Sequence, residues 1–179
     1  FSSFSLSKAA ATPMSKLQDL TGATVLLGVR MDDQLVYMDK REGEGMIRIS
    51  SDIGWRRPLH YGMLGMVLMA SLDSDQLESV LRKQPLKAYA PASITDQEVL
   101  RSRLAEVREQ GYVVEEAEAV EGIMGIAGPI RDYSRKVIAA LGIALPMAPY
   151  PSPEKKSRFI ESVREACREV SGNLGYGRI

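Results

Sequence analysis

The sequence predicts an α+β fold, and three observations predict it. Runs rich in β-forming residues lie on both sides of the chain's middle, over residues 24–40 and 112–145. The segment between them, residues 59–111, has apolar residues at helical spacing. The strand runs are joined by hairpin signals rather than by regular βαβ units. This pattern favours α+β over a doubly wound α/β fold.

The first part of the chain is predicted to form one helix and three strands. Thr12 and Pro13 resemble a helix start, with threonine as the N-cap and proline at the first helical position, and Gly22 ends this helix. Two strands then form an antiparallel hairpin around residues 31–33, and a third continues the sheet. The predicted strands are Thr24–Arg30, Gln34–Lys40 and Met46–Ser50.

The middle of the chain is predicted to be helical. After the turn at Pro58, a helix covers residues 59–71, and Asp73 with Gln76 begins a second, shorter helix. Thr95 and Glu98 have the spacing of a capping box and predict the start of a third helix. Gly111 ends it, because glycine adopts the left-handed conformation that commonly follows a last helical turn.

The second half of the sheet follows, and one helix ends the chain. The predicted strands are Tyr112–Glu115, Ile123–Arg131 and Lys136–Leu145, the last two joined by a turn at residues 132–135. Ser152 and Pro153 start the final helix, which ends near Gly172. One face of this helix carries an apolar stripe of Phe159, Val163, Cys167 and Val170.

Length and charge exclude several classes of protein. The 179 residues suit one domain, and the 23 basic residues balance the 23 acidic ones. We therefore expect no DNA binding by this segment alone. One cysteine cannot form an internal disulfide, and charged residues interrupt each apolar run, which predicts a cytoplasmic protein without a membrane span. The start at Phe1 suggests a piece of a longer protein.

Catalytic and metal sites have little support in the sequence. His60 and Cys167 are the candidates for nucleophilic or acid–base chemistry. Cys167 lies in the apolar stripe of its helix, which favours a buried thiol, and His60 at a helix start favours a structural hydrogen bond. One histidine and one cysteine are poor material for zinc. We expect no catalytic residues, no metal and no cofactor.

Two charged groups could still face a ligand. Glu115 ends a predicted strand, and alternation with Val114 could point its side chain inward, whereas Glu116, Glu118 and Glu121 are typical of a solvated loop. Arg56 and Arg57 could pair with a carboxylate ligand or with these glutamates, or they could lie exposed in a loop.

The order of several short motifs resembles a known family over nearly the whole chain. They are Pro58-Leu59-His60, Gly65 with Leu68 and Ala70, Leu100 through Gly111-Tyr112, Glu121-Gly122-Ile123, Ile126-Ala127, Pro129-Ile130 and Leu174-Gly175-Tyr176. In order and spacing they are similar to the C-terminal effector-binding domain of IclR-type bacterial transcriptional regulators. The resemblance implies a GAF-like fold, in which a curved antiparallel sheet is flanked by helices.

The resemblance also implies a domain organisation and partners. Residues 1–179 would be a single effector-binding domain, with residues 1–11 the end of an interdomain linker. Operator DNA would be bound only through an N-terminal winged helix-turn-helix domain that this chain lacks. The expected partners are a small organic effector and further copies of the chain, in a homodimer or homotetramer.

The family's effector cavity can be carried over position by position. It would be lined by Met46, Ile49, Met63, Leu64, Glu115, Ile123, Gly125, Gly142 and Ala144. Gly125 stands where a cysteine is common, Gly142 and Ala144 stand where serines are frequent, and Met66 replaces a frequent lysine. These departures predict a cavity with few hydrogen-bond donors. They favour an apolar or aromatic effector, with an organic acid as the other expectation.

Two other functions stay open from the sequence. The chain could be a stand-alone enzyme that uses His60 with a glutamate as acid and base. It could also be a GAF-like sensor from a different kind of signalling protein. The protein sequence upstream of Phe1 would distinguish them, because a winged helix-turn-helix there indicates a transcriptional regulator.

Overall fold

A computed structural model describes residues 3–44 and 52–177 of the protein. The described residues form, in chain order, α1 (Ser3–Thr21), β1 (Thr24–Met31), β2 (Gln34–Arg41), β3 (Arg56–Pro58), α2 (Gly62–Ala70), α3 (Ser74–Lys83), α4 (Gln97–Gln110), β4 (Val113–Glu116), β5 (Ile123–Arg131), β6 (Val137–Pro146) and α5 (Pro153–Asn173). Within these residues, none of the helices is long and apolar enough to cross a membrane.

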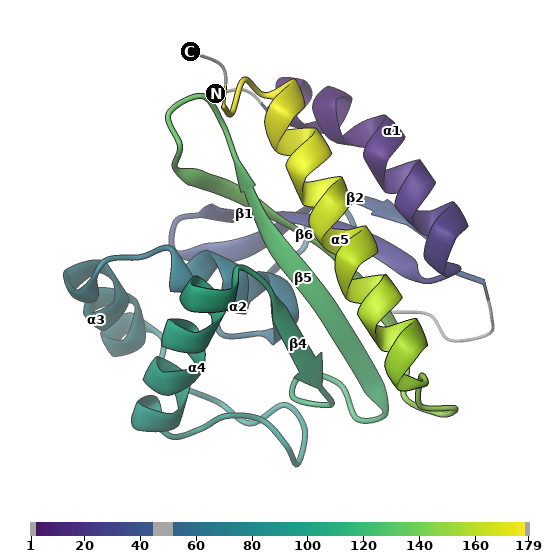
Figure 1. Ribbon diagram of the computed structural model, residues 1–179. Coiled ribbons are helices and arrows are strands. Elements are labelled where there is room, and N and C mark those ends of the chain that lie inside the picture. Colours follow the sequence, from purple (N-terminus) through teal and green to yellow (C-terminus); the bar gives the residue numbers. More distant parts are fainter. Residues whose placement is uncertain (1–2, 45–51, 178–179) are drawn as a thin grey trace.

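The strands form one antiparallel sheet in the order β3-β2-β1-β6-β5-β4. β1–β3 precede the helical middle of the chain and β4–β6 follow it, so each half of the sheet comes from one side, as predicted. The central pair, β1 and β6, joins the two halves. Figure 1 shows this twisted sheet with α1 and α5 on one face and α2 and α4 on the other. The predicted α+β class is confirmed.

Alternating side chains of the sheet separate two hydrophobic cores. On β6, Leu141 and Ile143 face the core beneath α1 and α5, whereas Ala140 and Ala144 face the core beneath α2 and α4. The period of two residues in a strand produces this division. Large residues fill the first face, and the small residues on the second leave room for α2. The cavity described below lies on this second side.

Several predicted boundaries are confirmed by their local chemistry. The β1–β2 hairpin turns through Asp32 and Asp33, whose φ angles of 51° and 59° suit a two-residue turn. Asp73 and Gln76 form the capping box of α3, with the Gln76 N–H donating to the Asp73 carboxylate at 2.8 Å. Gly111 follows α4 at a φ of 82°, which permits the left-handed turn.

Other predicted boundaries are wrong. Asp96, not Thr95, caps α4, because its carboxylate accepts the N–H groups of Glu98 and Val99 at 2.8 and 3.1 Å. α2 begins at Gly62 and not at residue 59, since Tyr61 N–H turns back to the Pro58 carbonyl at 3.0 Å. The predicted strand at residues 46–50 lies outside the described residues. β3 follows later and pairs with β2.

The first helix also begins earlier than predicted, at Ser3 rather than Thr12, and therefore includes Pro13. Residues 3–11, expected to be the end of a linker, are helical. Proline has no N–H, so the Ala9 carbonyl four residues earlier loses its intrahelical partner. The side-chain amide of Asn173 in α5 donates to that carbonyl at 3.0 Å. A neighbouring helix thus supplies the hydrogen bond that Pro13 cannot.

We expect Asn173→Ala to reduce the free energy of unfolding by about 1 kcal/mol, the usual net value of one such hydrogen bond. In a Pro13→Ala background the same substitution should cost clearly less, because the backbone of α1 then provides an N–H for the Ala9 carbonyl. Urea denaturation of the four proteins measures this coupling. An equal cost of Asn173→Ala in both backgrounds would show that the Asn173 amide does not compensate for Pro13.

Candidate functional site

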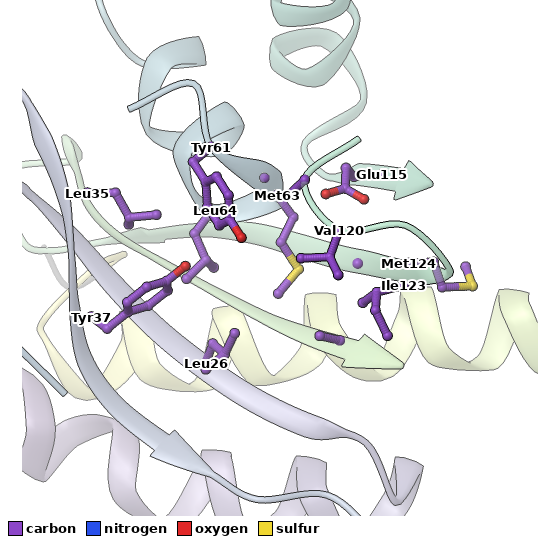
Figure 2. A pocket seen from close by; sticks show the side chains of 14 residues that line it. Leu26, Leu35, Tyr37, Tyr61, Met63, Leu64, Glu115, Val120, Ile123 and Met124 are labelled. Carbon is purple, nitrogen blue, oxygen red and sulfur yellow. The ribbon is translucent and has the colours of Figure 1, made fainter. Parts of the chain in front are cut away.

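A cavity of about 150 Å³ lies between the start of α2, the sheet, and the segment that joins β4 to β5. Small residues form its floor, because Gly125 on β5 and Ala144 on β6, which are direct partners in the sheet, carry little or no side chain. Figure 2 shows the surrounding side chains. The lining residues are Leu26, Leu35, Tyr37, Tyr61, Gly62, Met63, Leu64, Glu115, Ala119, Val120, Ile123, Met124, Gly125 and Ala144.

The structure brings together six of the nine residues that the resemblance implied. They come from α2, β4, β5 and β6, and they are Met63, Leu64, Glu115, Ile123, Gly125 and Ala144. Met46 and Ile49 lie outside the described residues. The Met63 side chain crosses the space above Gly125, where an added Cβ would lie only 2.5 Å from the Met63 sulfur. Glycine at this position thus leaves room for the methionine.

Gly142 corrects the predicted site, because it does not line the cavity. It lies between Leu26 on β1 and Ala127 on β5 in the sheet. A Cβ at Gly142 would lie 2.5 Å from the Ile126 carbonyl oxygen and 2.7 Å from the Ala127 Cβ. This glycine is required for the close approach of β5 and β6. Its role is structural, two residues before Ala144, which does line the cavity.

Sequence reasoning missed the aromatic residues of the cavity. Leu35 and Tyr37 are two residues apart on β2 and therefore share a face, so strand alternation could have placed them there. Tyr61 immediately precedes α2. Figure 2 shows the Tyr37 and Tyr61 hydroxyl groups directed toward the cavity. The cavity therefore has two tyrosine hydroxyl groups as donors, which the prediction of few donors did not include.

Glu115 is the buried acidic group of the cavity, and strand alternation predicted its inward direction. Glu115 is only 4% exposed. Within residues 3–44 and 52–177, its Oε2 atom has no hydrogen-bond partner. Burial raises the pKa of Glu115 to about 7, with a further rise from the charge of Glu118. Backbone hydrogen bonds from Glu118 and Ala119 oppose this rise.

Arg57 provides positive charge behind the opposite wall. Its guanidinium lies 4.7 Å from the centre of the Tyr61 ring and 5.6 Å from that of Trp55. It also hydrogen-bonds the Tyr37 side chain. Burial raises the pKa of Tyr37, and the nearby Arg57 partly opposes that rise. Arg56 points elsewhere, with its guanidinium 3.5 Å from the Asp32 carboxylate at the hairpin.

The two candidates for catalysis have structural roles. His60 Nε2 accepts the backbone N–H of Lys87 at 3.3 Å, and burial lowers the His60 pKa. Cys167 lies in the core beneath α5, on the other face of the sheet, where burial raises the thiol pKa to about 12. The thiol is therefore protonated and unreactive at neutral pH. Among the described residues, no three His, Cys, Asp or Glu side chains could hold a metal ion.

We expect the buried Glu115 carboxyl to make stability depend on pH. Between pH 4.5 and about 7 the folded protein retains a proton that the unfolded chain releases, so stability decreases as the pH rises. Glu115→Gln removes this effect. When the pH rises from 5 to 8, the free energy of unfolding of Glu115→Gln should increase by about 2 kcal/mol relative to that of the unsubstituted protein. Denaturation at both pH values tests this, and a pH-independent difference would contradict it.

Comparison with known proteins shows the family. The model for the C-terminal domain of the bacterial transcriptional regulator IclR matches residues 1–172. The chain belongs to the IclR family. Its fold confirms the GAF-like architecture, since the C-terminal domain of the KdgR regulator from Escherichia coli superimposes with a TM-score of 0.85 at 34% identity. That match covers 96% of this chain and 99% of the solved one.

The full-length KdgR regulator and one further relative of this IclR domain add functional information. The HTH-type transcriptional regulator KdgR of Escherichia coli K12 is 34% identical over 96% of this chain, which spans 65% of that protein. An IclR homologue from Microbacterium hydrocarbonoxydans, solved in complex with 4-hydroxybenzoate, has a TM-score of 0.88 at 26% identity. It is matched over 98% of this chain and 70% of its own. These names are those of regulators, which supports a regulatory domain rather than an enzyme.

Proposed function

We propose that this IclR domain binds a small organic effector in the cavity beneath α2, and that occupancy controls DNA binding by another domain of the regulator. The observation that carries the proposal is the cavity itself, which has apolar walls and the buried carboxyl group of Glu115, one oxygen of which accepts no hydrogen bond from the described residues. Such a combination of apolar lining and few polar groups is typical of small-molecule sites. The complex of an IclR homologue with 4-hydroxybenzoate supports it.

The volume of the cavity indicates the size of this effector. A cavity of about 150 Å³ accommodates a benzene ring in an engineered protein core. The walls contain Met63, Leu64 and Ile123, which suit the two faces of a ring, and Met63 can adapt because its side chain is flexible. We therefore propose a single-ring aromatic compound, and 4-hydroxybenzoate is a suitable first probe.

Control of DNA binding requires that the effector prefer one arrangement of the regulator over another. The available coupling cannot exceed this difference in binding free energy. We propose that the domain acts in the cytoplasm within a homodimer or homotetramer, and that effector binding at α2 changes how the subunits present their DNA-binding domains. Operator DNA is then a partner through those domains.

Thermal unfolding with added ligand tests the proposed effector class. At 100 times its dissociation constant, a ligand bound by the folded state adds about 2.7 kcal/mol, which corresponds to a rise in Tm of roughly 5–10 °C. We expect such a rise with 4-hydroxybenzoate and a smaller one with 2-naphthoate, because two fused rings need more space than the single ring that a volume of about 150 Å³ accommodates. An equal response to both, or to neither at millimolar concentration, would contradict the proposal.

A further inference from the structure

We infer that the effector carries a hydrogen-bond donor at one end and an acceptor or anionic group at the other, with the donor facing Glu115 and the acceptor facing Tyr37 and Tyr61. A para-substituted hydroxy- or aminoaromatic acid has this form. The inference rests on the proposed function and makes it more specific. It follows from the unequal distribution of polar groups around the cavity.

The ionised Glu115 carboxylate, which is the form present above its pKa of about 7, requires a donor. Its Oε2 atom is buried and, within the part of the chain that the structure describes, has no protein donor. The charge of the adjacent Arg103 lowers the pKa of Glu115, but its guanidinium donates its hydrogen bonds to Glu118 at 2.8 Å and to the Val114 carbonyl at 3.1 Å. A buried acceptor without a partner is costly, and a ligand hydroxyl or amine would satisfy it. A ligand carboxylate here would instead place a second negative charge beside Glu115.

The opposite end offers donors. A guanidinium group can only donate hydrogen bonds, so in the contact between Arg57 and Tyr37 the tyrosine oxygen is the acceptor. The hydroxyl hydrogen of Tyr37 then remains able to bond a ligand. The Arg57 guanidinium also lies over the Tyr61 ring at 4.7 Å, which places positive charge directly behind both tyrosines. This wall suits a carboxylate or carbonyl oxygen.

The two ends lie on opposite sides of an apolar space. Figure 2 shows Glu115 and Tyr37 on different sides of the cavity, with Met63 and Leu64 between them. A ligand that satisfies both ends therefore needs a flat apolar body with its polar groups at opposite ends. The para arrangement on a benzene ring provides this geometry, and the ring matches the volume discussed above.

Calorimetric titration with 4-hydroxybenzoate, its methyl ether and unsubstituted benzoate tests the donor end. At pH 8, above the Glu115 pKa of about 7, we expect 4-hydroxybenzoate to bind about 30-fold more tightly than 4-methoxybenzoate or benzoate, because only the hydroxyl donates to the ionised carboxylate. In Glu115→Gln the preference should fall to roughly 3-fold, since glutamine keeps an acceptor without the charge and adds a donor that the methoxy oxygen can use.

Glu116→Gln is the matched control. Glu116 is the next residue of β4, is exposed, and bonds Tyr150 and Lys156 away from the cavity. This variant should keep the full preference for 4-hydroxybenzoate. Tyr37→Phe should weaken all three compounds alike, by about 10-fold, because each has the same carboxylate at the tyrosine end.

The outcomes separate this inference from the proposed function. Tight binding of all three compounds without a preference, or a preference that Glu115→Gln leaves intact, would overturn the assignment of the donor end while the cavity still binds a ligand. Binding of none of them would contradict the proposed function, and the inference would fall with it. Binding that only Glu116→Gln weakens would place the ligand outside the cavity.

Discussion

Gly65→Ala is expected to destabilise the protein by at least about 3 kcal/mol and to abolish effector binding. Gly65 lies in α2, directly against the turn that precedes this helix. An alanine Cβ there would be 1.8 Å from the Leu59 carbonyl oxygen and 2.8 Å from its carbonyl carbon. Both are backbone atoms, so the clash is relieved only if the helix or the turn moves. Because α2 carries Met63 and Leu64, the cavity wall would move with it.

Gly172→Ala is the control for this substitution, since Gly172 lies inside α5 and an added Cβ there meets no atom within 4 Å. This variant should gain up to about 1 kcal/mol from the higher helix propensity of alanine. Urea denaturation of both variants measures the difference. If Gly65→Ala unfolds at the same urea concentration as the unsubstituted protein, α2 does not pack on the Leu59 turn as described.

Ala144→Leu should leave the protein folded and weaken effector binding by at least about 100-fold. The side chain of Ala144 borders the empty space of the cavity, so the three added carbon atoms would occupy the position of the ligand ring. Filling a cavity commonly preserves or increases stability, whereas an enlarged side chain in a packed region destabilises the fold. Thermal unfolding and calorimetry with 4-hydroxybenzoate distinguish these effects.

The same change at an exposed alanine provides the control. Ala105 lies on the solvent side of α4, and Ala105→Leu should alter neither Tm nor affinity appreciably. Equally tight binding of the ligand by Ala144→Leu and Ala105→Leu would show that the ligand does not bind beside Ala144. A large loss of stability in Ala144→Leu would instead show that the space beside Ala144 is already filled.

Much of the fold could be predicted because local chemistry determines the element boundaries. The turn at Asp32–Asp33, the capping box of Asp73 with Gln76, and Gly111 each specify a boundary from adjacent residues alone. The start of α1 could not be predicted in this way. Pro13 is typical of a first helical turn, and its tolerance inside α1 depends on Asn173, which lies in the last helix of the chain.

Part of the candidate site was also predictable from local sequence patterns. Strand alternation places Glu115 inward, and the family resemblance adds the small residues of β5 and β6. Gly142 was misplaced because distance along a strand does not show where a neighbouring strand closes over the backbone. The hydrogen bond between Arg57 and Tyr37 forms because β3 pairs with β2. The sequence alone did not predict that these two strands are neighbours.

The central claim is that the effector binds in the cavity beneath α2, and methyl NMR of methionine tests it most directly. Met63 lies in the cavity, whereas Met14 is buried in α1 on the opposite face of the sheet. On titration with 4-hydroxybenzoate, the methyl signal of Met63, assigned with Met63→Leu, should shift until saturation while that of Met14 stays in place. A saturating shift of Met14 with an unchanged Met63 signal would contradict the account.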